Sequence, residues 1–196
     1  VNFQIQKHKM SKIVITLCAV FAIFTTACAQ NNSKSDNMKK KTLVTYFSAT
    51  GTTENAAKKI ASVTGADIMP IQPVQKYTAA DLDWTNRQSR SSVEMNNLNS
   101  RPEIEASSKN ISEYDVVFIG YPIWWNLAPT VVNTFIESND LTGKTVIPFA
   151  TSGGDGIGNS ASKLKSQYPN LNWKEGKLLN GTSEKAIEQW IESLNL

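Results

Sequence analysis

Residues 43–65 read LVTYFSATGTTENAAKKIASVTG, and this stretch decides the fold of the chain. It begins with a short β-rich run, Leu43 to Phe47, which ends in a hydroxyl-rich turn. The following residues, 54–63, carry small and apolar side chains at helical spacing, and Gly65 ends that helix. A strand, a tight turn and a helix in direct succession indicate an α/β domain.

The same alternation continues along the chain. Strands are expected at 67–74, 116–120, 145–150 and 173–179, and helices at 129–137, 160–168 and 183–194. Pro70 and Pro73 favour an edge position for the second strand, whereas the apolar run 116–120 is typical of a central parallel strand. Five strands alternating with helices predict a doubly wound five-stranded parallel sheet with helices on both faces.

Residues 75–110 interrupt this alternation. The segment is polar, with a short helix signal at 79–84, and it contains Arg87, Arg90 and Arg101. So long an insertion in a compact domain is usually functional or flexible. Its arginines could meet an anionic substrate or a nicotinamide phosphate, or they could form surface ion pairs.

Cysteine and histidine are scarce in this 196-residue chain. His8, Cys18 and Cys28 are the only such residues, and all precede residue 29. The rest of the chain therefore cannot carry Ser-His-Asp or Cys-His catalysis, a disulfide, or a zinc site with Cys or His ligands. We expect no catalytic and no metal-ligating side chains, so any redox chemistry must come from a bound cofactor.

The first 29 residues resemble a secretory signal peptide. Three lysines precede the apolar run 13–24, and small residues follow. Ala27-Cys28-Ala29 fits ordinary signal peptidase, while Thr25 to Cys28 fits a lipoprotein signal with lipid on Cys28. Residues 30–41 are expected to form a flexible tether. We expect the domain, residues 42–196, to be exported, either to the periplasm or as a membrane-anchored lipoprotein.

The charge of the domain argues against nucleic acid as a partner. The whole chain has a formal charge of +3. From Thr42 onward it has 13 Lys and Arg against 16 Asp and Glu, a net charge of −3. A mildly acidic domain lacks the basic surface that nucleic acid requires. Contact with a membrane is expected only through a lipid anchor at Cys28.

Three expected strands end in unusual loops, and ligands of such sheets bind beyond the carboxyl ends of the strands. The first loop, Ser48 to Thr53, offers hydroxyls, one glycine and the N–H groups of a helix N-terminus. This chemistry suits a phosphate, although a simple helix cap would look similar. The loop has neither the P-loop lysine nor the G-x-G-x-x-G pattern of dinucleotide sites.

The other two loops complete the candidate site. Tyr121 to Asn126 contains adjacent tryptophans, which either pack in a core or face a planar ligand. Thr151 to Gly158 has four glycines, which either let backbone N–H groups approach a ligand or make a flexible turn. Together the loops predict a phosphate anchor, an aromatic wall and a wall of backbone amides.

These three loops, in this order, resemble the flavodoxin-like family and in particular a branch of bacterial flavoproteins, over roughly residues 42–194. The resemblance implies a flavodoxin-like sheet and one FMN bound without a covalent bond. It places the FMN phosphate at Ser48, Thr50, Gly51, Thr52 and Thr53. It places the isoalloxazine ring between Trp124 or Trp125 and the third loop, with Asn126 as a hydrogen-bonding partner. The remaining cofactor-binding residues that it implies are Pro122, Ile123, Ser152, Gly153 and Gly154.

The resemblance implies an FMN-binding protein in electron transfer, whose partner is a redox protein or a small-molecule acceptor. The alternative is an FMN-dependent NAD(P)H oxidoreductase acting on a quinone-type acceptor. A flavodoxin-fold module that binds another ligand, or none, is a third hypothesis. Electron-carrier flavodoxins are strongly acidic and cytoplasmic and lack so long an insertion, so this chain departs from them in three respects.

Overall fold

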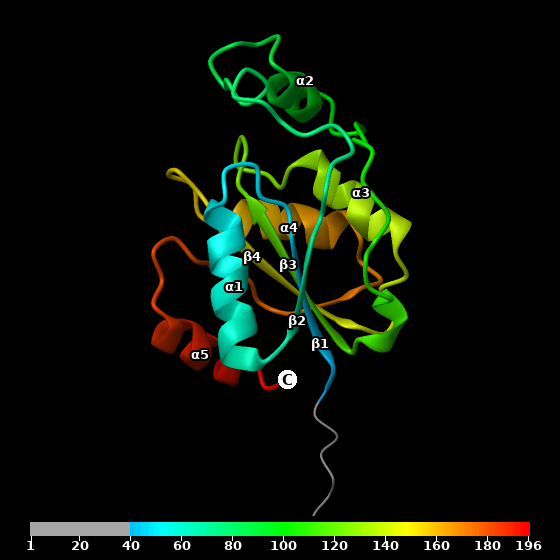
Figure 1. Ribbon diagram of the computed structural model, residues 1–196, viewed down its shortest axis with the longest axis vertical. Coiled ribbons are helices and arrows are strands. Elements are labelled where there is room, and N and C mark those ends of the chain that lie inside the picture. The colour runs from blue at the N-terminus through cyan, green and yellow to red at the C-terminus, as the bar shows by residue number, and fades with distance from the viewer. Residues whose placement is uncertain (1–39) are drawn as a thin grey trace, which may run out of the picture. The chain divides into compact units, whose positions relative to one another are not determined.

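The computed structural model describes residues 40–196, and the expected signal peptide, Cys28 and most of the tether lie outside the described residues. One parallel sheet forms the centre of the domain (Figure 1). Its order is β2-β1-β3-β4-β5, with β6 also pairing with β4. The strands are β1 (Thr42–Tyr46), β2 (Asp67–Pro70), β3 (Val116–Pro122), β4 (Thr145–Thr151), β5 (Asn172–Trp173) and β6 (Lys177–Leu178).

Five α-helices accompany the sheet in the described part of the chain. They are α1 (Thr52–Thr64), α2 (Arg90–Asn96), α3 (Thr130–Ser138), α4 (Gly158–Gln167) and α5 (Glu184–Ser193), with a short 3-10 helix at Ile111–Glu113. The predicted doubly wound parallel sheet is confirmed, and β2 lies at its edge as the prolines indicated. Four of the helices fall where the sequence predicted them, while α2 was not predicted.

The expected fifth strand is divided into two short strands, β5 and β6, which both pair with β4. Val146 pairs with Trp173 and Ala150 with Leu178, so this edge uses one residue more than β4 over the same length. Pro148 lies in the gap and has no N–H to donate to the edge strand. A Cβ on Gly176 would lie 2.7 Å from the Pro148 carbonyl oxygen, so the chain passes closely here only because residue 176 is glycine.

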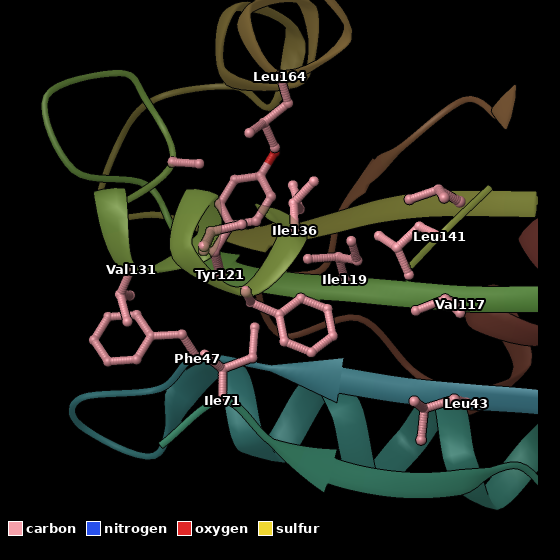
Figure 2. Close-up of a cluster of buried hydrophobic side chains, with 14 of the residues drawn as sticks. Leu43, Phe47, Ile71, Val117, Ile119, Tyr121, Val131, Ile136, Leu141 and Leu164 are labelled. Atoms are coloured by element: carbon pink, nitrogen blue, oxygen red, sulfur yellow. The ribbon is translucent and has the colours of Figure 1, made fainter. Parts of the chain in front are cut away.

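The sheet separates two hydrophobic cores. Helices α1 and α5 cover one face, where Ile60, Ile187 and Trp190 pack on side chains of β1, β3 and β4. Helices α3 and α4 cover the other face, where Figure 2 shows Ile136 and Leu164 over Ile119 and Tyr121. Side chains of β1 and β3 alternate between the two cores, as expected of strands buried on both faces. This rigid centre holds the loops at the carboxyl edge.

Residues 75–101 of the insertion lie beyond the carboxyl ends of the strands (Figure 1), and we call them the cap. The rest of the insertion runs back along the sheet, where Lys109 bonds to Asp67 at the start of β2. The helix expected at 79–84 is wrong, because these residues form turns. The Asp81 carboxylate accepts hydrogen bonds from the Thr78 N–H and hydroxyl, and such local bonds compete with helix formation. The helix of the cap is α2, which begins after Ser89, whose side chain accepts a bond from the Ser92 N–H.

Among residues 40–196, no helix combines the length and the apolar character that crossing a membrane requires.

Candidate functional site

A cavity of about 600 Å³ opens at the carboxyl ends of β1, β3 and β4. It brings together the three loops that the sequence singled out, together with part of the cap. Ten of the thirteen predicted residues line it: Ser48, Thr50, Thr52, Thr53, Pro122, Ile123, Trp124, Trp125, Ser152 and Gly153. Gly51, Asn126 and Gly154 do not line it, although they belong to the same loops. Its size lies within the range of small-molecule sites.

The first loop presents free donors at the start of α1. Gly51 precedes the helix with φ of 86°, a conformation that glycine adopts without strain, and its N–H donates to the Ser48 Oγ at 3.1 Å. The hydroxyls of Thr50 and Thr52 are exposed and lie 3.5 Å apart. The N–H groups of the first helical turn have no partner within the helix. Hydroxyls and N–H groups at a positive helix end suit an anion.

Thr53 differs from the other hydroxyl residues of this loop because its side chain is buried, with 1% exposed. Its Oγ1 lies 2.8 Å from the Thr151 Oγ1 at the end of β4. The bond fastens the first turn of α1 to the third loop. The Thr53 hydroxyl therefore serves first to position the loop, whereas those of Thr50 and Thr52 remain open.

The second loop turns the chain sharply at Trp125 and Asn126. Trp124 and Leu127 exchange two backbone hydrogen bonds of 3.0 and 2.9 Å. The two residues between them have φ of 46° and 61°, as in a type I′ turn. Left-handed backbone at a non-glycine residue costs of order 1–3 kcal/mol and is concentrated at functional sites. Trp125, whose backbone carries this strain, is 46% exposed and lines the cavity.

Trp124 has a different environment from its neighbour. Its ring packs edge-on against Phe47, with centroids 5.6 Å apart, and against Tyr77, with centroids 5.3 Å apart. Phe47 and Tyr77 also contact one another, with centroids 5.5 Å apart. Both tryptophans line the cavity, but Trp124 is held in an aromatic cluster at its border, whereas Trp125 is the more exposed of the two. Sequence reasoning could not distinguish the two.

The third loop satisfies most of its own N–H groups. The Ser152 Oγ accepts bonds from the N–H groups of Gly154, at 3.0 Å, and Asp155, at 2.7 Å. The Asn180 side chain accepts from the Ser152 N–H at 2.8 Å and donates to the Ser152 carbonyl. Among residues 152–155, the Gly153 N–H is the one left without a protein partner. In the part of this loop that lines the cavity, the expected wall of backbone amides thus narrows to the N–H of Gly153. Asn180 is a supporting residue that the sequence did not reveal.

The cap supplies lining residues that sequence reasoning missed. These are Leu82, Trp84 and Ser91, in addition to Ala49 and Thr151 of the loops. Trp84 is 74% exposed. A tryptophan inside a polar segment is a signal that could have identified it, whereas Leu82 and Ser91 carry none.

A buried ion pair fastens the cap to the aromatic cluster. The Tyr77 hydroxyl donates to Glu94, whose other carboxylate oxygen lies 2.6 Å from the Arg90 Nε. The Arg90 guanidinium lies over the Tyr77 ring, 4.0 Å from its centroid, and donates to the Gln75 carbonyl at 2.6 Å. Burial, and then the bond to Glu94, raise the pKa of the Tyr77 hydroxyl. Tyr77 therefore remains a hydrogen-bond donor at neutral and moderately alkaline pH.

The arginines of the cap do not line the cavity. Arg90 is held by Glu94, and Arg101 makes a two-bond pair with Glu137, of 2.7 and 2.9 Å. Every residue that lines the cavity is uncharged. Within residues 40–196 there is also no group of three or more His, Cys, Asp or Glu side chains that could hold a metal ion. The cavity therefore offers hydroxyls, the free N–H groups at the start of α1 and aromatic surface.

Comparisons with known proteins agree with this geometry. The family model described as Flavodoxin matches residues 41–194. The chain is 62% identical to a crystallised protein from Bacteroides eggerthii named a putative flavoprotein, with a TM-score of 0.79, covering 80% of this chain and 99% of that one. A similarly named protein from Bacteroides uniformis is 56% identical, with a TM-score of 0.76 and coverages of 78% and 98%.

A more distant structure shares the fold. A flavoprotein from Lactobacillus acidophilus, crystallised in complex with FMN, is 20% identical, with a TM-score of 0.62 and coverages of 80% and 99%. A search among curated protein sequences finds no match. The matched model spans nearly the whole described domain, and the three loops follow the strands in the order that the sequence predicted. The chain belongs to the flavodoxin family.

Proposed function

We propose that the protein binds FMN and acts in electron transfer. The observation that carries this proposal is that one cavity pairs the free N–H groups at the start of α1 with the exposed ring of Trp125, a residue held in left-handed backbone. FMN has a phosphate at one end and a planar ring at the other. The cavity lies within a flavodoxin-family domain whose distant structural relative from Lactobacillus acidophilus holds FMN.

The residues of the cavity fit such a group. Thr50, Thr52 and the first N–H groups of α1 would hold the phosphate, with Ser48 and Gly51 shaping the turn. Trp125 would stack on the ring, and the Gly153 N–H would be directed to its polar edge. When bound, FMN supplies the capacity to accept and donate electrons, which the side chains of the domain lack. The uncharged lining and the electron-rich indole disfavour added negative charge on a bound ring.

One phosphate site argues for FMN over FAD. The start of α1 offers free N–H groups to the cavity. The start of α2 also borders the cavity, through Ser91, but the Ser91 N–H is bonded to the Asp81 carbonyl and the next N–H to the side chain of Ser89. The lining includes no arginine or lysine to hold a second phosphate. Release of the cofactor by heat, followed by mass measurement, tests this. Finding FAD, or finding no flavin after reconstitution, would contradict the proposal.

The phosphate assignment has its own test. Thr50→Val and Thr52→Val each remove a hydroxyl that would bond a charged group, which costs roughly 1.5–3 kcal/mol, or about ten- to a hundredfold in affinity. Titration with FMN and with riboflavin separates the phosphate from the ring, so riboflavin is the matched control. Equal weakening of both ligands would show that these hydroxyls do not bind the phosphate.

An FMN-dependent NAD(P)H oxidoreductase acting on a quinone-type acceptor is the second candidate. The observation that favours an enzyme is the cap, which lines the cavity and so could shape a site for a small substrate. Steady-state oxidation of NADH and NADPH with a quinone acceptor distinguishes the candidates. Turnover would favour the enzyme, while its absence together with reversible reduction of the bound flavin would favour the carrier.

We also propose that the protein works outside the cytoplasm, held to a membrane by lipid on Cys28. The basic and apolar run before Cys28 supports export, and every cysteine and histidine of the chain precedes residue 29. The signal has no twin arginine, so the chain would cross unfolded and acquire FMN after export. Cell fractionation of the native protein and of Cys28→Ser tests this. Uncleaved cytoplasmic protein would contradict export, and a soluble product unaffected by Cys28→Ser would contradict the anchor alone.

A further inference from the structure

The cap gives the cavity a second exposed tryptophan. Trp84 lines the same cavity as Trp125 but comes from a different part of the chain, and 74% of its side chain is exposed. An indole offers a large apolar area, whose removal from water favours binding. Leu82, two residues earlier, lines the cavity beside it. The cap therefore presents apolar surface toward the space above the flavin loops.

The cap is held in place at its base. Tyr77 packs on Phe47 and Trp124 at the border of the cavity, and its hydroxyl is bonded to Glu94 of α2. The Ser91 N–H donates to the Asp81 carbonyl at 3.0 Å, which fixes the start of α2 against the turn that carries Leu82. The turn that carries Leu82 and Trp84 is therefore held by contacts on both sides, at Tyr77 and at Ser91. Trp84 accordingly belongs to a structured wall of the cavity.

The charges next to this wall in the chain are unfavourable for an anion. Asp81 and Asp83 flank Leu82, and each carboxylate accepts hydrogen bonds from a nearby threonine, Thr78 or Thr85. These bonds lower the pKa of both carboxyls, so both are ionised at neutral pH. The guanidinium of Arg90, which might offset them, is paired with Glu94 and bonded to the Gln75 carbonyl. Asp81 and Asp83 do not line the cavity themselves, but a pyrophosphate placed against Leu82 would lie near their charges and would find no cation in the lining.

We infer that Trp84 and Leu82 form a second ligand site at the mouth of the cavity, which binds an uncharged, planar aromatic compound by stacking on the indole. The site favours a neutral ring over a nucleotide because Leu82 is flanked in the chain by two ionised carboxylates and no cation lines the cavity. The role of this compound as the electron acceptor rests on the proposed function, whereas its binding does not.

Binding of 1,4-naphthoquinone to the full chain, measured by calorimetry with and without FMN, tests the inference. The matched anionic probe is 1,4-naphthoquinone-2-sulfonate, which has the same ring system. We expect the neutral probe to bind at least about tenfold more tightly. Trp84→Leu should weaken its binding by about tenfold, because stacking and apolar contact are lost. Trp84→Phe, which keeps a flat ring, should restore most of the affinity.

Two controls keep the result interpretable. Val93→Ala alters an exposed residue of α2 that does not line the cavity, so it should leave both affinities unchanged. The affinity for FMN should be the same in the wild type and in Trp84→Leu. A fall in FMN affinity in Trp84→Leu would make Trp84 a wall for the flavin itself and would overturn the second site.

Each remaining outcome decides for or against the second site. Equal or tighter binding of the sulfonate, or unchanged affinity in Trp84→Leu, would overturn the inference. A wild-type chain that binds neither probe would overturn it too and would leave Trp84 for contact with a protein. Naphthoquinone binding without any FMN binding would contradict the proposed function while the second site stands. FMN binding without naphthoquinone binding would contradict the second site while the proposed function stands.

Discussion

The hydroxyl of Thr53 lies 2.8 Å from the hydroxyl of Thr151, and this single bond joins the first turn of α1 to the end of β4. Both residues are buried. The two loops that would hold opposite parts of a cofactor are thus linked to one another by side chains as well as by the sheet. Because each hydroxyl is the other's buried side-chain partner, the two residues should act as a unit.

Thr53→Val and Thr151→Val should each lower the free energy of unfolding by about 1–3 kcal/mol, because each leaves one buried hydroxyl without its partner. The double variant removes both hydroxyls and should cost less than the sum. Urea unfolding of the four proteins measures this. Thr142→Val, at an exposed position, is the control. Additive losses would show that the two hydroxyls do not depend on one another.

The two adjacent tryptophans should respond in opposite ways to replacement. Trp125→Asn places a residue that tolerates left-handed backbone at φ of 46° and should raise the free energy of unfolding, by up to about 1 kcal/mol. A stacked indole donates an electron to the excited flavin, so flavin bound to the wild type should be quenched. Trp125→Asn should therefore weaken FMN binding and restore the fluorescence of the flavin that still binds. Trp124→Leu should keep the flavin quenched but lower the free energy of unfolding by about 2–4 kcal/mol, because it removes two aromatic contacts.

Urea unfolding and flavin fluorescence, measured on both variants, separate these effects. Quenching that survives Trp125→Asn and is lost in Trp124→Leu would reverse the assignment of the stacking residue. Quenching that survives both replacements would show that neither ring stacks on the flavin.

The sheet could be predicted from the sequence because its signals are local. The apolar run 116–120 and the small residues on one side of α1 have the spacing of their elements, and the prolines of β2 mark an edge. The division of the fifth strand could not be predicted. It depends on Pro148 of a neighbouring strand, whose lack of an N–H matters only once the two segments lie side by side.

The sequence predicted which loops form the site, but it did not predict the role of each side chain and N–H group within them. Their positions after three parallel strands bring them together by topology alone. The roles of Trp124 and Trp125 depend on a turn and an aromatic cluster that includes Tyr77, a residue of the cap. The satisfied N–H groups of the third loop depend in part on Asn180, which follows β6. Such partners are distant in the sequence and leave no local pattern.

A pH-dependent contribution to stability is expected from Glu137. Its carboxylate accepts two hydrogen bonds from Arg101 of the cap and one, at 2.6 Å, from the hydroxyl of Tyr168, which follows α4. Because Glu137 belongs to α3, these bonds connect the cap to both helices. The bonds from Arg101 foremost hold the pKa of Glu137 below its ordinary value of 4.5. A carboxyl whose pKa is lowered by folding stabilises the folded state at every pH above its unfolded pKa. This contribution is lost as the pH falls through the pKa of the folded state.

Glu137→Gln should therefore lower the free energy of unfolding at pH 7 by less than about 1 kcal/mol, since the pair is partly exposed. The difference from the wild type should shrink as the pH falls below 4.5. Urea unfolding at several pH values measures it. A difference that stays constant down to acid pH would show that the effect is not due to the charge of Glu137.

The bond between Tyr77 and Glu94 should control the local stability of the cap. Tyr77→Phe keeps the ring against Phe47 and Trp124 but removes the hydroxyl that donates to a buried carboxylate. Losing a bond to a charged group costs roughly 1.5–3 kcal/mol, so the amides of α2 should exchange hydrogen about ten- to a hundredfold faster. The amides of β1 and β3 should be nearly unaffected, because they report opening of the core.

Tyr114→Phe is the matched control, because it removes a tyrosine hydroxyl that donates to another carboxylate, that of Asp67, at 2.7 Å. That bond lies at the start of β2, so its loss should leave the exchange of α2 unchanged. Hydrogen exchange followed by mass spectrometry resolves both segments. Equal acceleration throughout the domain in Tyr77→Phe would mean that the bond stabilises the whole fold. No acceleration at α2 would mean that Arg90 alone suffices to hold Glu94 and, with it, the wall that carries Trp84.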